Sequence, residues 1–240
     1  MRSMAAVAAV AILAAAAPAR ATAPWANSGI ADWTKSPAPD TEPNFSAPKP
    51  IHFSLANGLR VVVIANHKLP LVSAALVVPN AGSAADPTGK AGLAAFTADL
   101  LDEGAGGMSA LAIADELDRL GASTGLSIQP DEAILYLSTL AKTLDATVEL
   151  WAKTISAPDF TEADVARVHG DHLTALKLRP DRPREVAGIV LDNALYGRAT
   201  PYGHPAAGYL EDLEKLGVKD VRAFHDERWQ PFRMTLVVAG

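Results

Sequence analysis

The dipeptide Asn57-Gly58 separates two short apolar segments, and this arrangement restricts the possible folds of the chain more than any other feature. Residues 51–55 alternate between apolar and polar side chains, and residues 59–65 are mostly β-branched and apolar. An Asn-Gly pair between two such segments is a strong signal for a tight β-hairpin. The sequence therefore predicts that a folded domain begins at residue 51 with two antiparallel strands.

The rest of the chain shows strand patterns first and mainly helical patterns later. Further strands are predicted at 71–78, at about 122–129 and 132–140, and at 234–238. Helices are predicted at about 92–103, 110–120, 144–155, 161–179 and 184–196, with one or two more between 209 and 227. Strands that precede a mainly helical half indicate an α+β fold, with helices layered on one face of a largely antiparallel sheet.

Local signals define the ends and faces of several elements. Ser109 is a suitable N-cap and Gly121 a suitable C-terminal stop for the helix between them, whereas the glycine-rich segment 104–107 is predicted simply to break the preceding helix. We expect the strand at 71–78 to be buried on both faces and His225, within a charged segment, to lie on the surface. One helix should bury the stripe formed by Leu144, Val148, Trp151 and Ile155.

Composition excludes several classes of function. None of the 240 residues is cysteine, which removes disulfide scaffolds, thiol nucleophiles and zinc–thiolate sites. The 27 acidic and 21 basic residues give a net charge of −6, and a chain with this balance lacks the basic surface that nucleic-acid binding requires. A hydrophobic content of 49% also excludes a chain that is disordered throughout.

The first 50 residues read as a targeting segment followed by a linker. Arg2, the apolar run 4–18 and the sequence Ala19-Arg20-Ala21 predict a signal peptide over 1–21, with cleavage before Thr22. The run is shorter than the roughly 20 residues of a membrane span, although an uncleaved anchor is the alternative. Residues 22–50 hold six of the 17 prolines and are predicted to form a stiff linker. We therefore expect an exported protein without a membrane span after signal removal, periplasmic in a bacterium.

Several ordered segments resemble one protein family. Residues 92–104, Gly-Leu-Ala-Ala-Phe-Thr-Ala-Asp-Leu-Leu-Asp-Glu-Gly, follow a hairpin and a glycine-containing loop, and Tyr-Gly at 196–197, Pro-Tyr-Gly-His-Pro at 201–205 and the final segment 233–240 come later. This order is similar to the N-terminal half of the pitrilysin/insulinase family of zinc metallopeptidases, which includes the mitochondrial processing peptidase. The resemblance covers residues 51–240. Family members are usually about twice as long, so it implies that a C-terminal half is missing from this chain.

The resemblance also implies a degenerate zinc site. Active members carry His-x-x-Glu-His on the helix at 92–103, where two histidines bind zinc and the glutamate polarises water. The matching positions here are Ala95, Ala98 and Asp99. The family's third ligand is a glutamate on the helix at 161–179, and this chain has no glutamate between 163 and 184. We therefore expect no catalytic residue and no zinc in this chain, with zinc held by a catalytic partner.

A substitute metal site has to be weighed against a structural role for the same side chains. Asp99, His169 and His172 are the candidates, because the two histidines are three residues apart and can share a helix face. However, His172 is in register with the apolar stripe predicted to pack inward. A histidine at the core boundary, satisfied by hydrogen bonds, is the favoured interpretation.

Peptide binding is the other half of the family's mechanism. Active members have a strand containing Asn-Ala whose edge pairs with the substrate backbone. The matching strand here contains Ser123, Thr124, Gly125 and Leu126, with Gly125 and Leu126 in place of Asn-Ala. A strand edge can still add a peptide through backbone hydrogen bonds. The alternative is that this edge is paired or covered within an assembly.

Taken together, the residues and the resemblance predict a non-catalytic homologue. Family halves that lack zinc ligands pair with halves that have them, so the expected partner is a catalytic insulinase-family subunit in a heterodimer that binds peptide substrates. Two other functions stay open: a structural or scaffold protein with the same fold, and an active hydrolase with an altered metal site.

Overall fold

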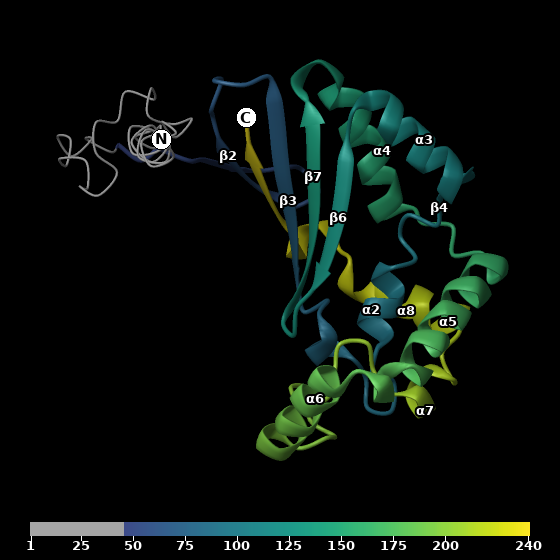
Figure 1. Ribbon diagram of the computed structural model, residues 1–240. Helices are drawn as coiled ribbons and strands as arrows, with labels where there is room; N and C mark the ends of the chain where they lie inside the picture. The colour runs from purple at the N-terminus through teal and green to yellow at the C-terminus, as the bar shows by residue number, and fades with distance from the viewer. Residues whose placement is uncertain (1–45) are drawn as a thin grey trace, which may run out of the picture. The chain divides into compact units, whose positions relative to one another are not determined.

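A six-stranded sheet forms the centre of the computed structural model, which describes residues 46–240 (Figure 1). The predicted signal peptide and residues 22–45 of the predicted linker lie outside the described residues; residues 46–50 have no regular structure and are exposed. The strands of the sheet are β1 (Ile51–Ser54), β2 (Arg60–Ile64), β3 (Leu71–Pro79), β6 (Ser123–Ile128), β7 (Glu132–Leu140) and β8 (Thr235–Ala239).

The strand order is β1-β2-β8-β3-β7-β6, so β1 and β6 are the two edges. Every neighbouring pair is antiparallel except β2 with β8, where Val62 lies opposite Val237 in a parallel pair. The last strand of the described chain therefore inserts beside the third one and joins the N-terminal hairpin to the rest of the sheet. This arrangement confirms the prediction of a largely antiparallel sheet that begins with a hairpin.

The helices lie mainly on one side of the sheet, which confirms the predicted α+β layering (Figure 1). Helices α2, α3, α4, α5 and α8 form this layer, and α6 lies beyond the end of the sheet. Two paired strands of two residues each, β4 (Gly104–Ala105) and β5 (Met108–Ser109), connect α2 to α3. The helices are α2 (Leu93–Ala98), α3 (Ala110–Leu120), α4 (Leu144–Ser156), α5 (Glu162–Lys177), α6 (Pro183–Tyr196), α7 (Leu210–Leu213) and α8 (Val218–Arg228).

The core lies between the sheet and this helix layer. Leu76, Leu135 and Leu137 contribute one face of the sheet, because alternate residues of a strand point to opposite faces. Phe96 of α2 and Trp151 of α4 are among the helix residues that pack with them. Phe96 is completely buried, so its ring anchors α2 in this core.

Helix ends that have a local sequence signal agree with the prediction. The Ser109 hydroxyl accepts a hydrogen bond from the Ala112 N–H, and Gly121 adopts a left-handed conformation (φ 65°) at the end of α3. Thr161 caps α5 by accepting from the Asp164 N–H. Within the described residues, no helix combines the length and the apolar character needed to cross a membrane.

Two predicted elements differ in the structure around α2 and β3. The first helix ends at Ala98 rather than at 103, because the backbone then continues in tighter turns whose N–H groups bond three residues back, as Leu101 does to Ala98. The segment 104–107 contains β4 and the turn to β5, so it is more than a helix break. β3 is not buried on both faces, because helices cover only one of them, and Ser73 is exposed.

The burial of two residues also differs from the prediction. Val148 is exposed, and the buried face of α4 contains Thr147 instead. The Thr147 hydroxyl can be buried because it donates to the Thr143 carbonyl and lies 2.9 Å from the Thr139 hydroxyl. His225 is buried rather than on the surface, since its ring Nε2 lies 2.8 Å from the Ile155 carbonyl oxygen.

Candidate functional site

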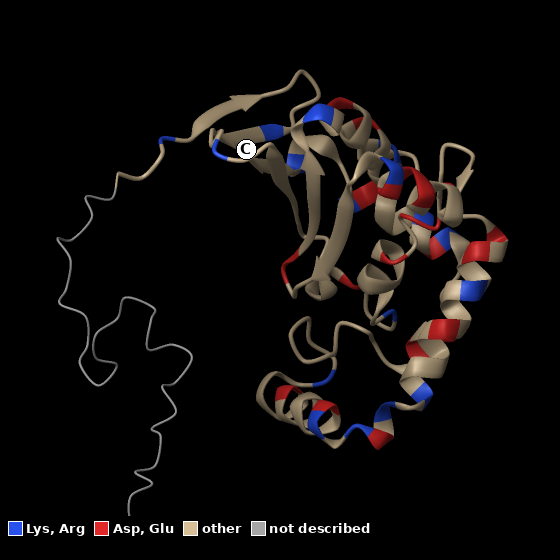
Figure 2. Cartoon of the chain, turned by 45° about the horizontal axis from the view of Figure 1, so that its top comes forward, with Lys and Arg blue, Asp and Glu red and all other residues tan. Residues whose placement is uncertain are grey.

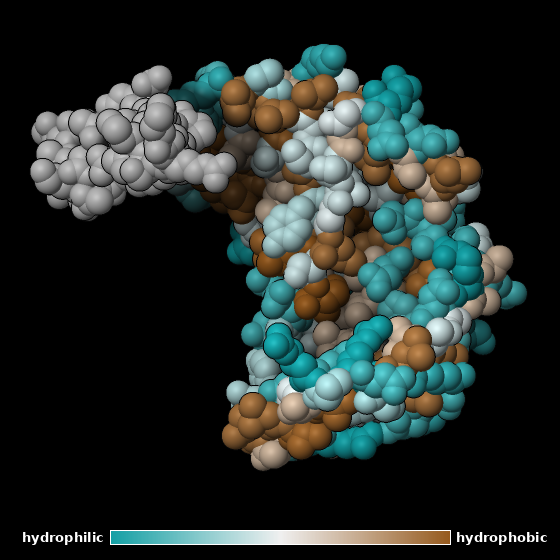
Figure 3. Space-filling model, in the orientation of Figure 1, coloured by the Kyte–Doolittle hydropathy of each residue, from teal (hydrophilic) through white to brown (hydrophobic). Residues whose placement is uncertain are grey.

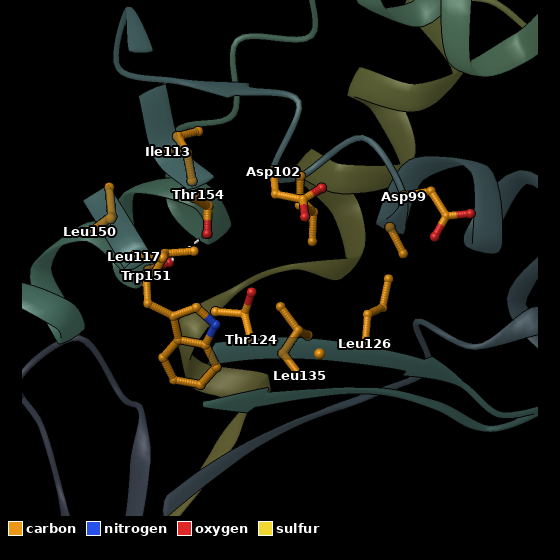
Figure 4. A pocket seen from close by; sticks show the side chains of 13 residues that line it. Asp99, Asp102, Ile113, Leu117, Thr124, Leu126, Leu135, Leu150, Trp151 and Thr154 are labelled. Carbon is orange, nitrogen blue, oxygen red and sulfur yellow. Dashed lines mark hydrogen bonds between the residues drawn. The ribbon is translucent and has the colours of Figure 1, made fainter. Parts of the chain in front are cut away.

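A cleft of about 160 Å³ lies between the end of α2, the edge strand β6 and the helices α3 and α4 (Figure 4). Its walls combine apolar side chains with two carboxylates and two hydroxyls. The sheet contributes Thr124, Gly125, Leu126 and Leu135; the turn after α2 contributes Asp99, Leu101 and Asp102; and the helices contribute Ala98, Ile113, Leu117, Leu150, Trp151 and Thr154.

The helix α2 and its C-terminal end bring two of the three motif positions, Ala98 and Asp99, to this cleft. Ala95 and Asp99 are four residues apart and share a face of the helical turn, as the two histidines of the family motif would. Ala98 is buried and lines the cleft. Methyl groups therefore stand at the first metal-ligand position and at the position of the general base.

Asp99 is paired with a histidine from another helix. The Nε2 atom of His172, on α5, lies 2.9 Å from the Asp99 carboxylate oxygen Oδ2. The His172 ring is largely buried and packs against the Phe96 ring, with 5.5 Å between ring centroids. The carboxylate that stands at the second ligand position is thus already hydrogen-bonded.

His169 does not join this pair. Its Nε2 atom lies 2.7 Å from the Leu213 carbonyl oxygen, and its ring centroid lies 5.6 Å from that of Phe96. Among residues 46–240, no three His, Asp or Glu side chains are grouped so that they could hold a metal ion. The residues present therefore do not fit a zinc ion, and no hydrolytic step through a metal can be derived from them.

Asp102 is a site residue that the sequence reasoning missed. Desolvation by the surrounding protein raises the pKa of its carboxyl although part of the side chain reaches solvent, and the nearby charges of Glu103 and Asp99 raise it further. Glu103 itself forms an ion pair with Arg167 of α5. The sequence signal for Asp102 was the presence of three acidic residues within positions 99–103, because like charges close together raise each other's pKa values.

The strand β6 presents a free edge beside the cleft. The Gln129 N–H donates to the Glu132 carbonyl across the hairpin, and antiparallel pairs alternate between hydrogen-bonded and non-hydrogen-bonded. This alternation directs the backbone of Ser123 and Gly125 toward β7, and the backbone N–H and C=O groups of Thr124 and Leu126 away from it. Within the described residues no further strand pairs with this edge.

Trp151 adds a hydrogen-bond donor to the cleft wall. The Trp151 side chain is buried and lines the cleft. Figure 4 shows the Trp151 indole nitrogen directed toward the side of the cleft where Thr124 lies. An indole N–H that faces a cleft can donate to an acceptor of a bound group.

Comparison with known proteins gives relatives of both kinds, peptidases and non-peptidases. A protein from Mycobacterium leprae described as an uncharacterized zinc protease is 29% identical over 189 residues, which cover 78% of this chain and 42% of that protein. A protein from Helicobacter pylori described as a non-peptidase homolog is 23% identical over 180 residues, covering 75% of this chain and 41% of the relative.

A solved structure shares the fold. The inactive domain of a peptidase M16 from Pseudomonas fluorescens superimposes with a TM-score of 0.76 and 26% identity, covering 80% of this chain and 46% of that one. The chain thus spans less than half the length of each of these three proteins. The model of the insulinase family, peptidase family M16, matches residues 60–194, which is more than half of the sequence. This chain therefore belongs to the insulinase (M16) peptidase family.

Proposed function

We propose that this chain is a non-catalytic partner subunit of a zinc peptidase complex, in which it completes the chamber that binds peptides. The observation that carries the proposal joins two features: α2 has Ala95 and Ala98 where a metal site needs a ligand and a base, and no other strand of residues 46–240 pairs with the edge of β6 beside the cleft. Zinc would be supplied by a catalytic insulinase-family subunit. A relative described as a non-peptidase homolog supports a role without catalysis.

Peptide binding would use the outward backbone groups of Thr124 and Leu126. An extended peptide that pairs with this edge would form a seventh strand, with main-chain hydrogen bonds giving affinity. Its alternate side chains would point into the cleft, between Leu126 and Leu135 on one wall and Asp99 and Asp102 at the other. Apolar and basic side chains suit such a surface, because the carboxylates attract positive charge.

We further infer that the complex acts after export. The support comes from residues 1–21, whose charged start, apolar run and small-residue cleavage sequence are typical of a signal peptide. N-terminal sequencing of the protein recovered from the periplasm tests this inference, since the mature chain should begin at Thr22. A chain recovered only from the cytoplasm with Met1 intact would contradict it.

A substitution of Thr124 tests the peptide edge directly. Thr124→Pro removes the outward N–H, and because that group does not pair with β7 the sheet should tolerate the proline. Thr124→Val keeps the N–H and is the matched control. The probe is a fluorescently labelled, unstructured peptide that alternates leucine and lysine, and its dissociation constant is measured by fluorescence anisotropy. Weaker binding to the proline variant alone supports the proposal, and equal binding to both variants contradicts it.

A reconstitution experiment tests the partner role. The purified chain is mixed with a zinc-binding insulinase-family protein from the same organism, and cleavage of a quenched fluorescent peptide is followed. We expect no cleavage by the chain alone and a several-fold higher rate for the mixture, abolished by a chelator. Chelator-sensitive cleavage by the isolated chain that returns when zinc is added back would overturn the non-catalytic assignment.

A further inference from the structure

The loop between α6 and α7 contains a segment, residues 198–205, that we call the strap (yellow-green in Figure 1). The strap has neither helix nor strand, and Arg198 is its one residue coloured by charge in Figure 2. Its backbone hydrogen bonds join residues three positions apart, such as the Gly203 N–H with the Thr200 carbonyl. A segment without backbone bonds to neighbouring elements opens at a low free-energy cost, so side chains have to hold the strap on the domain.

Among the described residues, two side chains of the strap hydrogen-bond to segments more than 70 positions away. The Tyr202 hydroxyl donates to the Asp131 carboxylate over 2.6 Å, in the turn between β6 and β7. The Nε2 atom of His204 lies 2.9 Å from the Ser83 carbonyl oxygen and 3.2 Å from Oδ2 of Asp86, both in the segment before α2. The His204 side chain is 8% exposed, whereas Tyr202 is 50% exposed. The contact made by His204 is therefore the buried one of the two.

Both ring nitrogens of His204 face hydrogen-bond acceptors. Nδ1 lies 3.1 Å from the Thr200 carbonyl oxygen, while Nε2 faces the Ser83 carbonyl and the Asp86 carboxylate. A neutral imidazole has one donor and one acceptor nitrogen, but the protonated ring has two donors. The neutral ring would place a lone pair against an oxygen atom and leave a buried acceptor unsatisfied. This position therefore requires the imidazolium form.

The charged groups around His204 come from the segment before α2, from the strap and from α7. The hydrogen bond with the fully buried Asp86 carboxylate is the main cause that raises the pKa of His204, although burial opposes it. Arg198 forms an ion pair with Glu211, so these two charges neutralise each other. His204 lines a cavity of about 420 Å³ whose charged lining residues are Asp86, Arg198, Glu211 and Asp212.

Asp86 is held at α2 independently of the imidazolium. Its two carboxylate oxygens accept hydrogen bonds from the N–H groups of Gly92 and Ala94, each over 2.7 Å, and these donors do not titrate. Loss of the His204 proton therefore removes a donor from the strap and leaves Asp86 bound at the start of α2. In Figure 3 the molecular surface is hollowed between the sheet and α6, so a strap that detaches there enters solvent.

We propose that the strap is a pH-sensitive latch, which protonated His204 closes onto the segment before α2 and which loss of the ring proton releases while α2 stays folded. Release opens the cavity beside Asp86, because the strap forms one of its walls. The opening equilibrium should be constant below the ordinary histidine pKa of about 6.5, rise up to tenfold per pH unit above it, and level off above the pKa of the closed form. This latch goes beyond the proposed function and requires neither a peptide nor a catalytic partner.

Hydrogen–deuterium exchange of the full chain, followed by mass spectrometry from about pH 6 to about pH 9, tests the latch. Exchange is expressed as a protection factor against an unstructured peptide of the same sequence at the same pH, which removes the intrinsic pH dependence. Protection of the strap should fall by up to about tenfold per pH unit. Protection of residues 93–98 in α2 should stay constant over the same range, since Asp86 remains bound there.

Three variants separate the titration of His204 from other effects. His204→Gln should make the protection of the strap independent of pH, because glutamine does not titrate. His52→Gln, at an exposed histidine of β1, is the matched control and should keep the decrease of the wild type. Tyr202→Phe removes the other contact and should lower the protection of the strap by about two- to tenfold at every pH without changing its pH dependence.

The wild type alone can also overturn the proposal. Titration of the His204 ring, followed by NMR, should have its midpoint above pH 6.5 and at the pH where the protection of the strap levels off. A midpoint below 6.5, a strap whose protection does not change with pH, or a parallel loss of protection in α2 would each overturn the latch. A decrease that His204→Gln retains would overturn it as well.

Discussion

The Nε2 atom of His172 lies 2.9 Å from the Oδ2 atom of Asp99, so these two side chains are directly hydrogen-bonded. Asp99 occupies the position of the second histidine of the family motif, and His172 reaches it from α5, the helix on which the resemblance puts the third ligand. A direct side-chain hydrogen bond thus links the two elements that a metal ion would otherwise join. The same geometry makes the site open to reconstruction.

The variant Ala95→His/Asp99→His should acquire zinc binding. The two introduced histidines share a face of the α2 turn, and His172 lies close enough to serve as a third nitrogen ligand. We expect about one zinc ion per chain for the variant and no stoichiometric zinc for the wild type. Titration with zinc, followed by metal analysis after dialysis, measures the difference.

The control for this prediction removes the third ligand. Adding His172→Ala to the double variant should abolish tight binding, because two histidines four residues apart do not hold zinc firmly by themselves. Zinc that binds the wild type stoichiometrically and is lost in Asp99→Ala would show that the present residues already form a metal site. That result would contradict the interpretation of Asp99 and His172 given above.

The fold was predictable where short-range signals determine the structure. The Asn57-Gly58 turn and the caps at Ser109 and Gly121 depend on residues a few positions apart, and each is found where the sequence indicates. The parallel pairing of β8 with β2 was not predicted, because it joins segments about 175 residues apart and neither carries a signal for its neighbour. Attention to the β6 edge followed from the family resemblance rather than from the strand itself, and whether that edge is free or covered stayed open at the sequence level.

The missing metal ligands of the site could be predicted from the sequence, but the contacts between its side chains could not. The loss of ligands at Ala95 and Ala98 follows from residue identity alone. The pairing of Asp99 with His172 joins residues 73 positions apart, so it depends on how α5 packs on α2. The burial of His225 likewise depends on a carbonyl 70 residues away, and a charged surrounding sequence gave no hint of it.

Replacement of Trp151 by phenylalanine should separate stability from peptide binding. Trp151→Phe keeps an aromatic ring in the core and removes the indole N–H that faces the cleft, so we expect a cost below about 2 kcal/mol in the free energy of unfolding. If a peptide acceptor pairs with this donor, affinity should fall by roughly two- to tenfold, as for a neutral hydrogen bond. Chemical denaturation and the anisotropy assay measure the two quantities. Unchanged affinity would place the peptide away from this wall of the cleft.

Gly208 and Gly170 should respond to alanine in opposite directions. A Cβ atom on Gly208 would lie 2.0 Å from the Ala91 carbonyl oxygen, and its φ of +73° disfavours any side chain. Gly208→Ala should therefore destabilise the domain by more than about 1 kcal/mol. Gly170 lies within α5, and a Cβ atom added there would have no atom within 4 Å apart from its chain neighbours and the nearby backbone of its own helix, so Gly170→Ala should stabilise by about 1 kcal/mol. Denaturant unfolding of both variants checks the signs.

The stability of the domain should fall as the pH rises through the pKa of His204. The hydrogen bond with Asp86, whose carboxylate lies 3.2 Å from Nε2, raises the pKa of His204 although burial opposes this, and contacts with backbone carbonyls of Thr200 and Ser83 add to it. A histidine with a higher pKa in the folded state stabilises that state in its protonated form. The contribution is complete below the unfolded-state pKa of about 6.5 and is lost above the folded-state value.

Two variants separate the titration of His204 from the other role of Asp86. His204→Gln should remove the decrease in unfolding free energy between mildly acidic and mildly alkaline pH, because glutamine does not titrate. Asp86→Asn should lower stability at every pH as well, since the Asp86 carboxylate also accepts hydrogen bonds from the N–H groups of Gly92 and Ala94 at the start of α2. Urea unfolding at several pH values measures both effects. A pH dependence that His204→Gln leaves intact would come from another titrating group and would contradict this prediction.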